Sequence, residues 1–155
     1  MYIAEFDKAY VAGNRNKRAV LAVVEQADGK PNIITLEWFM RTSINPPMFA
    51  ISVGHQRYSH EALQKNRYFN LVVPSSEMRE DLIYCGTKSG RDYDKFAERS
   101  IKSVPGKLKK LPILTDAVAN FECKIITQVN SGDHTIFVGE VKHSWVDETK
   151  ELLKL

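Results

Sequence analysis

The segment ISVGHQRYSH, residues 51–60, combines residue types that can hold an anion. Ser52 ends an apolar run, and Gly54 allows the backbone to turn. Arg57 can donate two hydrogen bonds to one phosphate, and Ser59 stands where a helical pattern begins. A phosphate dianion is held best by several donors together with a helix dipole, so the segment predicts a phosphate site. From these residues alone, the alternative is that Ser59 only caps the helix and Arg57 is solvated.

The run NIITLEWF, residues 32–39, offers a place for a planar ring near this anion site. Asn32 and Thr35 are short polar side chains in a β-rich segment, and Trp38 could form a flat apolar wall. On composition alone, ordinary core packing accounts for Trp38 equally well. A cofactor that carries both a heteroaromatic ring and a phosphate would use both segments.

Three further residues could contribute to such a site, although each has an ordinary structural role as its default. Lys95 and Phe96 could supply a charge and an apolar face, or be a surface lysine and a core phenylalanine. His134 carries an imidazole ring that could take part in chemistry, but beside Asp133 at a strand entry it could be only a turn residue. No HExxH spacing and no convincing Ser-His-Asp arrangement is present, so metal-dependent and triad hydrolases are disfavoured.

Alternating β-rich and helical patterns predict the elements that position these residues. The expected strands cover residues 18–25, 32–39, 48–54, 68–74, 119–129 and 134–146. The Asp28–Gly29 pair predicts a hairpin turn after the first strand, and NSGD predicts another between the last two strands. The segments 32–39 and 48–54 are expected to be neighbouring strands joined by a Pro-Pro loop.

Three short helices are expected between the strands, over residues 59–66, 75–86 and 89–98. Their expected first residues or caps are Ser59, then Ser75 or Ser76, then a capping box of Ser89 and Asp92. No strand-helix unit repeats, so a parallel doubly wound sheet is disfavoured. A β-barrel with helical insertions is the better interpretation.

Length and composition bound the function classes. The 155 residues suit one domain, 1–155, and 22 basic against 19 acidic residues give a net charge of +3 that does not call for nucleic acid. Lysines concentrate only in 101–112, which is expected to be a solvated loop. No run approaches the roughly 18 apolar residues of a membrane span. Cys85 and Cys123 lack CxxC spacing, which favours a cytoplasmic protein without disulfides or structural zinc.

Four blocks, taken in order, resemble one known family. They are NIITLEWFMRTSINPPMFAISVGHQRYSHEAL, FNLVVPS, CGTKSGRDYDKF and ECKIITQVNSGDHTIFVGEV. Together they are similar to the flavin reductase-like proteins with an FMN-binding split barrel, and most closely to flavoredoxins. The likeness covers about residues 18–147. The N-terminal segment matches no block of this family.

The resemblance implies a mainly β fold, an antiparallel Greek-key split β-barrel with short inserted helices, that forms homodimers and binds FMN noncovalently. It assigns Asn32, Thr35 and Trp38 to the flavin ring. It assigns to the phosphate Ser52, Arg57, Tyr58 and Ser59. Lys95 and Phe96 fall in a block near the flavin, and His134 falls where a nicotinamide would approach.

The function implied by the resemblance is electron transfer from NADH or NADPH through FMN to free flavin, a ferric chelate or a protein acceptor. Family chains commonly continue past the GEV strand into an aromatic-rich tail, and the different ending DETKELLKL leaves an FMN carrier without nicotinamide turnover as an alternative. The other alternative is a nucleic-acid-binding barrel that uses Lys102, Lys107, Lys109 and Lys110.

Overall fold

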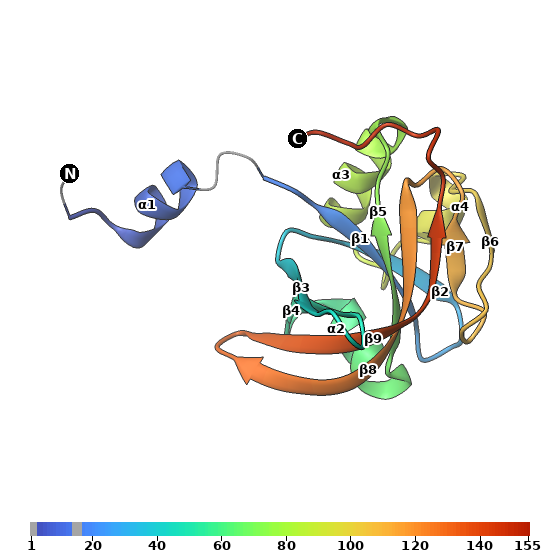
Figure 1. Ribbon diagram of the computed structural model, residues 1–155, viewed down its shortest axis with the longest axis horizontal. Helices are drawn as coiled ribbons and strands as arrows, with labels where there is room; N and C mark the ends of the chain where they lie inside the picture. Colours follow the sequence, from blue (N-terminus) through green and yellow to red (C-terminus); the bar gives the residue numbers. More distant parts are fainter. Residues whose placement is uncertain (1–2, 14–16) are drawn as a thin grey trace.

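A computed structural model describes residues 3–13 and 17–155, which form a strongly curved antiparallel sheet with short helices against it (Figure 1). The strands of the sheet are β1 (Val20–Glu25), β2 (Pro31–Leu36), β3 (Phe39–Ser43), β4 (Met48–Gly54), β5 (Tyr68–Val73), β8 (Ala119–Ser131) and β9 (His134–Val146). Their order across the sheet is β2-β1-β5-β8-β9-β4-β3. The expected antiparallel split barrel with short helices is thereby confirmed.

The two predicted hairpin turns lie where the sequence places them. Gly29 has a φ of 81° in the β1–β2 turn, and Gly132 has a φ of 61° between β8 and β9. Glycine adopts this left-handed region without the steric cost that a side chain brings. The β8–β9 hairpin is the longest ladder, and β9 also pairs with β4 from Met48 opposite Glu140 to Gly54 opposite His134. This pairing brings the end of β4 beside the start of β9.

Strand β1 lies at the centre of the protein because both of its faces are buried. Val20, Ala22 and Val24 belong to the apolar cluster inside the barrel. Leu21 and Val23 belong to a second cluster beneath the helix that follows β5. This double burial explains the continuous apolar run, which lacks the alternation of a half-exposed strand.

The predicted strand 32–39 is wrong at its C-terminal end. Strand β2 ends at Leu36, and a separate strand, β3, begins at Phe39 and pairs with β4. The expectation that β2 and β4 are neighbouring strands is therefore wrong. Strand β3 takes the place beside β4. The consecutive strands β2 and β3 form the two edges of the sheet, and Trp38 lies at the bend between them. Trp38 is therefore at the rim of the barrel.

The expected serine caps of two helices are wrong. Helix α2 (Tyr58–Asn66) has Arg57 in the N-cap position, and Ser59 lies buried in its first turn. Helix α3 (Arg79–Thr87) follows the 3₁₀ turn η1 (Ser76–Met78), and no serine side chain caps either element. Tertiary contacts have replaced local capping, since the hydroxyl of Ser59 hydrogen-bonds to another element.

The predicted capping box of Ser89 and Asp92 is also wrong. Helix α4 (Lys95–Glu98) is capped by Asp94, whose carboxylate accepts a hydrogen bond of 3.1 Å from the Ala97 N–H. The Ser89 hydroxyl instead accepts from the Arg91 N–H at 3.2 Å and shapes the loop between α3 and α4. This loop borders the site described below.

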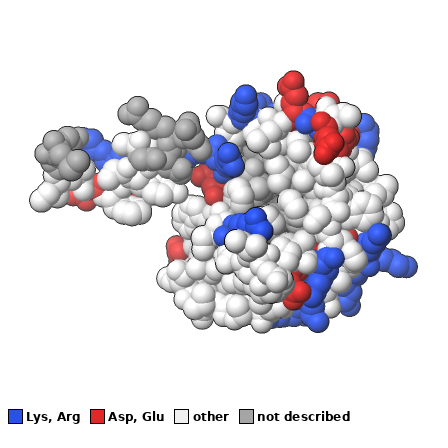
Figure 2. All heavy atoms as spheres, viewed as in Figure 1, with Lys and Arg blue, Asp and Glu red and all other residues white. Residues whose placement is uncertain are grey.

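The lysine-rich segment 101–112 is more ordered than the expected loop. It contains β6 (Ser103–Pro105), which pairs with β7 (Pro112–Leu114) in a separate ribbon. Figure 2 shows positive side chains gathered at one edge of the face, near this ribbon. Two of its lysines lie over aromatic rings of the barrel, Lys107 over Trp145 and Lys109 over Tyr68.

Helix α1 (Phe6–Gly13) stands to one side of the barrel (Figure 1). Its Phe6 and Val11 side chains are exposed, and the Tyr10 hydroxyl accepts a hydrogen bond of 3.2 Å from the indole N–H of Trp38. No described helix has the length and apolar character needed to span a membrane.

Candidate functional site

A pocket of about 230 Å³ opens between β2, the start of α2 and the loop after α3. Four cationic side chains line it, those of Arg57, Lys88, Arg91 and Lys95. No aspartate or glutamate is among its lining residues. We call it the anion pocket, because its positive lining has no carboxylate to neutralise it.

The start of α2 adds hydrogen-bond donors to the anion pocket. No side chain caps this helix, and the N–H groups of Tyr58 and Ser59 have no hydrogen-bond partner among the described residues, whereas the N–H of His60 donates to the Arg57 carbonyl. The Arg57 guanidinium makes no ion pair or hydrogen bond with any described residue. An uncapped helix start beside an unpaired arginine is an arrangement that binds phosphate.

Buried polar groups form the floor of the anion pocket. The Asn32 side-chain amide donates a hydrogen bond of 3.1 Å to the Ser59 hydroxyl, and both side chains are buried. Gly90 packs directly against this pair, since a Cβ at that position would lie 2.5 Å from the Asn32 amide. The close approach requires glycine and holds the loop after α3 against β2.

Lys95 is a buried cation at the base of the same pocket, with only 4% of its surface exposed. Its ammonium donates to the carbonyl oxygens of Ile33 at 2.7 Å and Cys85 at 2.8 Å, and so links β2 to α3. Burial lowers the pKa of Lys95 from its ordinary value. An ammonium has three donors, so one remains for a ligand in the pocket.

A second pocket, of about 380 Å³, continues from the anion pocket along the barrel rim. Ile34, Thr35 and Arg57 line both pockets, so the two are joined. The Thr35 hydroxyl donates a hydrogen bond of 2.5 Å to the carbonyl of Leu82, which fixes this part of β2 against α3. We call the second pocket the ring pocket, because Trp38 forms one of its walls.

The wall of the ring pocket pairs an indole with an imidazole. The rings of Trp38 and His134 have centroids 4.6 Å apart, and the Trp38 side chain is 50% exposed. His134 Nδ1 lies 2.6 Å from a carboxylate oxygen of Asp133, and this hydrogen bond lowers the pKa of Asp133. Trp38 is therefore not a core residue, and the His134 ring is held by its neighbours.

Comparison with known proteins identifies the family. The model of the flavin reductase-like domain matches residues 14–154. The chain belongs to the flavin reductase-like family. This confirms the resemblance that the four sequence blocks indicated.

Members of the flavin reductase-like family share the fold and part of the sequence. A flavoredoxin structure from Methanosarcina acetivorans is 26% identical with a TM-score of 0.84, covering 96% of this chain and 76% of that chain. A protein of Archaeoglobus fulgidus is 36% identical over 114 residues, or 74% of this chain, and the chain spans 64% of that relative. An NADH-dependent FMN reductase of Agrobacterium fabrum is 26% identical over 87% of this chain and 80% of its own length.

Most of the predicted site residues gather in the two joined pockets of this flavin reductase-like chain. The anion pocket has among its lining Asn32, Thr35, Arg57, Tyr58, Ser59 and Lys95. The ring pocket has among its lining Thr35, Trp38, Ser52, Arg57 and His134. Their roles in binding and catalysis remain predictions.

Phe96 lies apart from these residues, because it packs against the apolar cluster beneath α3 and borders a third pocket.

Two basic residues of the anion pocket, Lys88 and Arg91, were not predicted from the sequence, although basic residues on both sides of Gly90 were the available signal. Cys85 also lines this pocket, and burial raises its pKa to about 11. A thiol held protonated is a weak nucleophile, consistent with a structural role.

A pair of histidines contacts Thr135 near the start of β9. His55 and His60 both hydrogen-bond to the Thr135 hydroxyl, at 3.2 and 2.9 Å. Burial, and then the neighbouring His55, lower the pKa of His60 below its ordinary value of 6.5. Within residues 3–13 and 17–155, no three His, Cys, Asp or Glu side chains gather to hold a metal ion.

This histidine pair predicts a loss of stability in mild acid. Between the lowered folded pKa of His60 and its unfolded value of 6.5, the unfolded chain binds more protons, so stability falls as pH falls through that window. Between pH 7.5 and 5.5, we expect the unfolding temperature of His60→Gln to drop less than that of the wild type. The glutamine amide keeps a hydrogen-bond donor for the Thr135 hydroxyl. Thermal unfolding at both pH values measures this, and equal drops would contradict it.

Proposed function

We propose that this chain is an FMN-binding flavin reductase that passes electrons from NADH or NADPH to free flavin, a ferric chelate or a protein acceptor. One observation supports it above the others: a cationic pocket without carboxylates joins a pocket walled by an exposed tryptophan. FMN carries a phosphate and a planar ring on one molecule, which would occupy the anion pocket and the ring pocket respectively. The two free, buried cysteines support a reducing compartment, the cytoplasm, as its location.

The anion pocket would hold the phosphate. Arg57 is unpaired within the described residues and can donate a bidentate pair of hydrogen bonds, while the first turn of α2 would supply the backbone N–H groups of Tyr58 and Ser59 as donors. The Ser59 hydroxyl accepts a hydrogen bond from Asn32, so this side chain would shape the floor of the anion pocket. The buried charge of Lys95 adds attraction for an anion in this partly desolvated place.

The ring pocket would hold the isoalloxazine. Trp38 would cover one part of the isoalloxazine. Thr35 of β2 and Ser52 of β4 line the same pocket. The opening at the barrel rim leaves room for a second flat molecule to approach. Bound FMN would supply the redox chemistry, taking hydride from a reduced nicotinamide and giving electrons to the acceptor.

His134 would position the nicotinamide. The Asp133 carboxylate accepts a hydrogen bond from Nδ1 of His134, and no described residue hydrogen-bonds to Nε2 of His134. The ring stands beside Trp38 at the open side of the pocket, where a carboxamide could reach Nε2. Hydride transfer needs no protein base, so His134 orients the donor and does not abstract a proton.

Anaerobic reduction tests this function. Protein saturated with FMN and freed of excess flavin is mixed with NADH and then NADPH, and the visible flavin absorption is followed. Bleaching by either nucleotide faster than that of free FMN supports the reductase. Retained flavin that neither nucleotide bleaches would exclude the reductase and support the FMN carrier.

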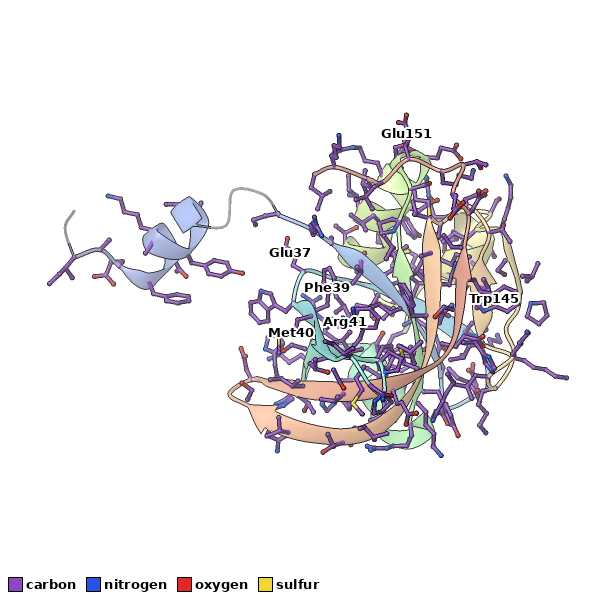
Figure 3. All side chains as sticks on the ribbon, in the orientation of Figure 1. Glu37, Phe39, Met40, Arg41, Trp145 and Glu151 are labelled. Carbon is purple, nitrogen blue, oxygen red and sulfur yellow. The ribbon has the colours of Figure 1, made fainter. Side chains whose placement is uncertain are left out.

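We also propose that two copies of the chain associate through β3, β4 and the start of β9. An apolar pocket of about 270 Å³ lies there, lined by Trp38, Met40, Ala50 and Ile136 among others. Met40 is 60% exposed, and Figure 3 shows it near Phe39 on the side of the barrel nearest α1. Exposed apolar surface beside a pocket is typical of a protein interface.

Met40→Lys is expected to convert the dimer to a monomer at micromolar concentration, because it places a charge within an apolar contact. Sedimentation velocity measures the change. Val104→Lys is the control, since Val104 is exposed on the separate β6–β7 ribbon. A wild-type chain that sediments as a monomer would contradict the proposal.

A further inference from the structure

Helix α1 precedes the part of the chain that the family model matches. The model of the flavin reductase-like domain begins at residue 14, whereas α1 spans Phe6–Gly13. The flavin and nicotinamide sites proposed above use no residue of this helix. Figure 1 shows α1 on the same side of the barrel as β3. A role for α1 must therefore be inferred from its own contacts.

Tyr10 connects α1 to the ring pocket. It lines this pocket together with Trp38 and His134. The Tyr10 hydroxyl accepts the hydrogen bond of 3.2 Å from the Trp38 indole N–H, and the centroids of the Trp38 and His134 rings are 4.6 Å apart. The pocket is thus lined by aromatic side chains from three separate elements: α1, the bend after β2 and the start of β9.

Phe6 supports the Tyr10 ring from the same helix. The two residues are about one helical turn apart, and their rings are stacked, with centroids 5.7 Å apart and an angle of 19° between the ring planes. Phe6 is 75% exposed, so the pair is not part of an apolar core. A stacked pair outside the core leaves aromatic surface for a planar ligand in the pocket that Tyr10 lines.

Helix α1 is too short to be stable without a packing partner. Isolated helices shorter than about 12 residues are marginal in water, and α1 has 8 residues. Residues 5–12 are all exposed, so the barrel buries little of this helix. A planar ligand in contact with Tyr10 would add a packing surface, and its binding would stabilise α1 by the same free energy.

We propose that α1 is a cover for the ring pocket, and that Tyr10 is a further contact of the flavin ring. The proposal rests on the proposed flavin site, because it takes the isoalloxazine to lie in the ring pocket. Trp38 and Tyr10 both present aromatic surface to the ring, and the bound ring holds α1 against the barrel.

Titration with riboflavin tests the Tyr10 contact, because riboflavin has the flavin ring without the phosphate. Tyr10→Ala is expected to weaken riboflavin binding about tenfold, since a stacking surface is lost. Tyr10→Phe keeps the ring and should stay within about threefold of the wild type. Val11→Ala is the matched control on the same helix and should change nothing, because Val11 is exposed and does not line the ring pocket.

Hydrogen exchange tests the cover. Amide exchange in residues 6–13 of the wild type is expected to slow at least about fivefold at saturating riboflavin, because the bound ring stabilises α1. In Tyr10→Ala, at a riboflavin concentration that saturates the variant, the exchange of the same segment should barely slow.

The outcomes distinguish the cover from the flavin site. If the wild type binds neither FMN nor riboflavin, both proposals are overturned. If riboflavin binds but Tyr10→Ala loses no affinity, or Tyr10→Phe loses as much as Tyr10→Ala, the ring contact is wrong and the flavin site stands. Exchange in α1 that slows with protein concentration and not with riboflavin would assign the helix to an interface between two copies and overturn the cover.

Discussion

Arg57→Ala is expected to weaken FMN binding by about 10- to 100-fold, because hydrogen bonds to a charged partner contribute about 1.5–3 kcal/mol. Riboflavin, which has the same ring without the phosphate, is expected to bind the variant and the wild type equally. Arg57 makes no ion pair within the described residues, so its removal leaves no protein carboxylate unpaired. Quenching of flavin fluorescence in parallel titrations measures both ligands.

Two further variants sharpen the test of Arg57. Arg57→Lys keeps the charge but loses the bidentate geometry, and should give an intermediate affinity. Arg79→Ala is the control, because Arg79 contacts the carbonyl of Lys154 and lies outside the anion pocket. Unchanged FMN affinity in Arg57→Ala, or an equal loss for riboflavin, would remove Arg57 from the phosphate site.

Lys95→Met is expected to lower the free energy of unfolding by about 2 kcal/mol and to weaken flavin binding as well. The change leaves the carbonyls of Ile33 and Cys85 without their donor, at a cost of about 1–3 kcal/mol for each buried group. The loss is partly offset, because a buried ammonium that is costly to desolvate is removed. Urea unfolding of the flavin-free protein measures the stability.

Lys102→Met is the matched control for Lys95. Lys102 is exposed and pairs with Asp116 only at 3.6 Å, so its loss should change stability by less than about 0.5 kcal/mol. Equal stabilities of wild type and Lys95→Met would show that the two hydrogen bonds contribute nothing net. The account of Lys95 as the link between β2 and α3 would then be wrong.

The parts of the fold that local sequence determines could be predicted. Asp28–Gly29 and the NSGD turn specify hairpins because Gly29 and Gly132 adopt positive φ, and the β-rich runs beside them are long. The break at Trp38 could not be predicted, because no proline or glycine marks it. It arises from the pairing of β3 with β4 and becomes visible only with the whole sheet.

In the candidate site, too, the residues placed by local sequence could be predicted, and those placed by tertiary packing could not. Arg57, Tyr58 and Ser59 are consecutive, so their shared place at the start of α2 followed from the local pattern. Lys88 and Arg91 reach the same pocket through the packing of α3 and its following loop on β2, which sequence spacing does not reveal. The hydroxyl of Ser59 is used by a residue 27 positions away, and local reasoning assigned it to a cap.

The most direct test of the central claim is the visible absorption spectrum of the purified chain after saturation with FMN and gel filtration. The joined anion and ring pockets predict stoichiometric retained flavin, with a perturbed spectrum from contact with Trp38. A colourless protein after gel filtration, together with no binding in equilibrium titration, would contradict the assignment of both pockets.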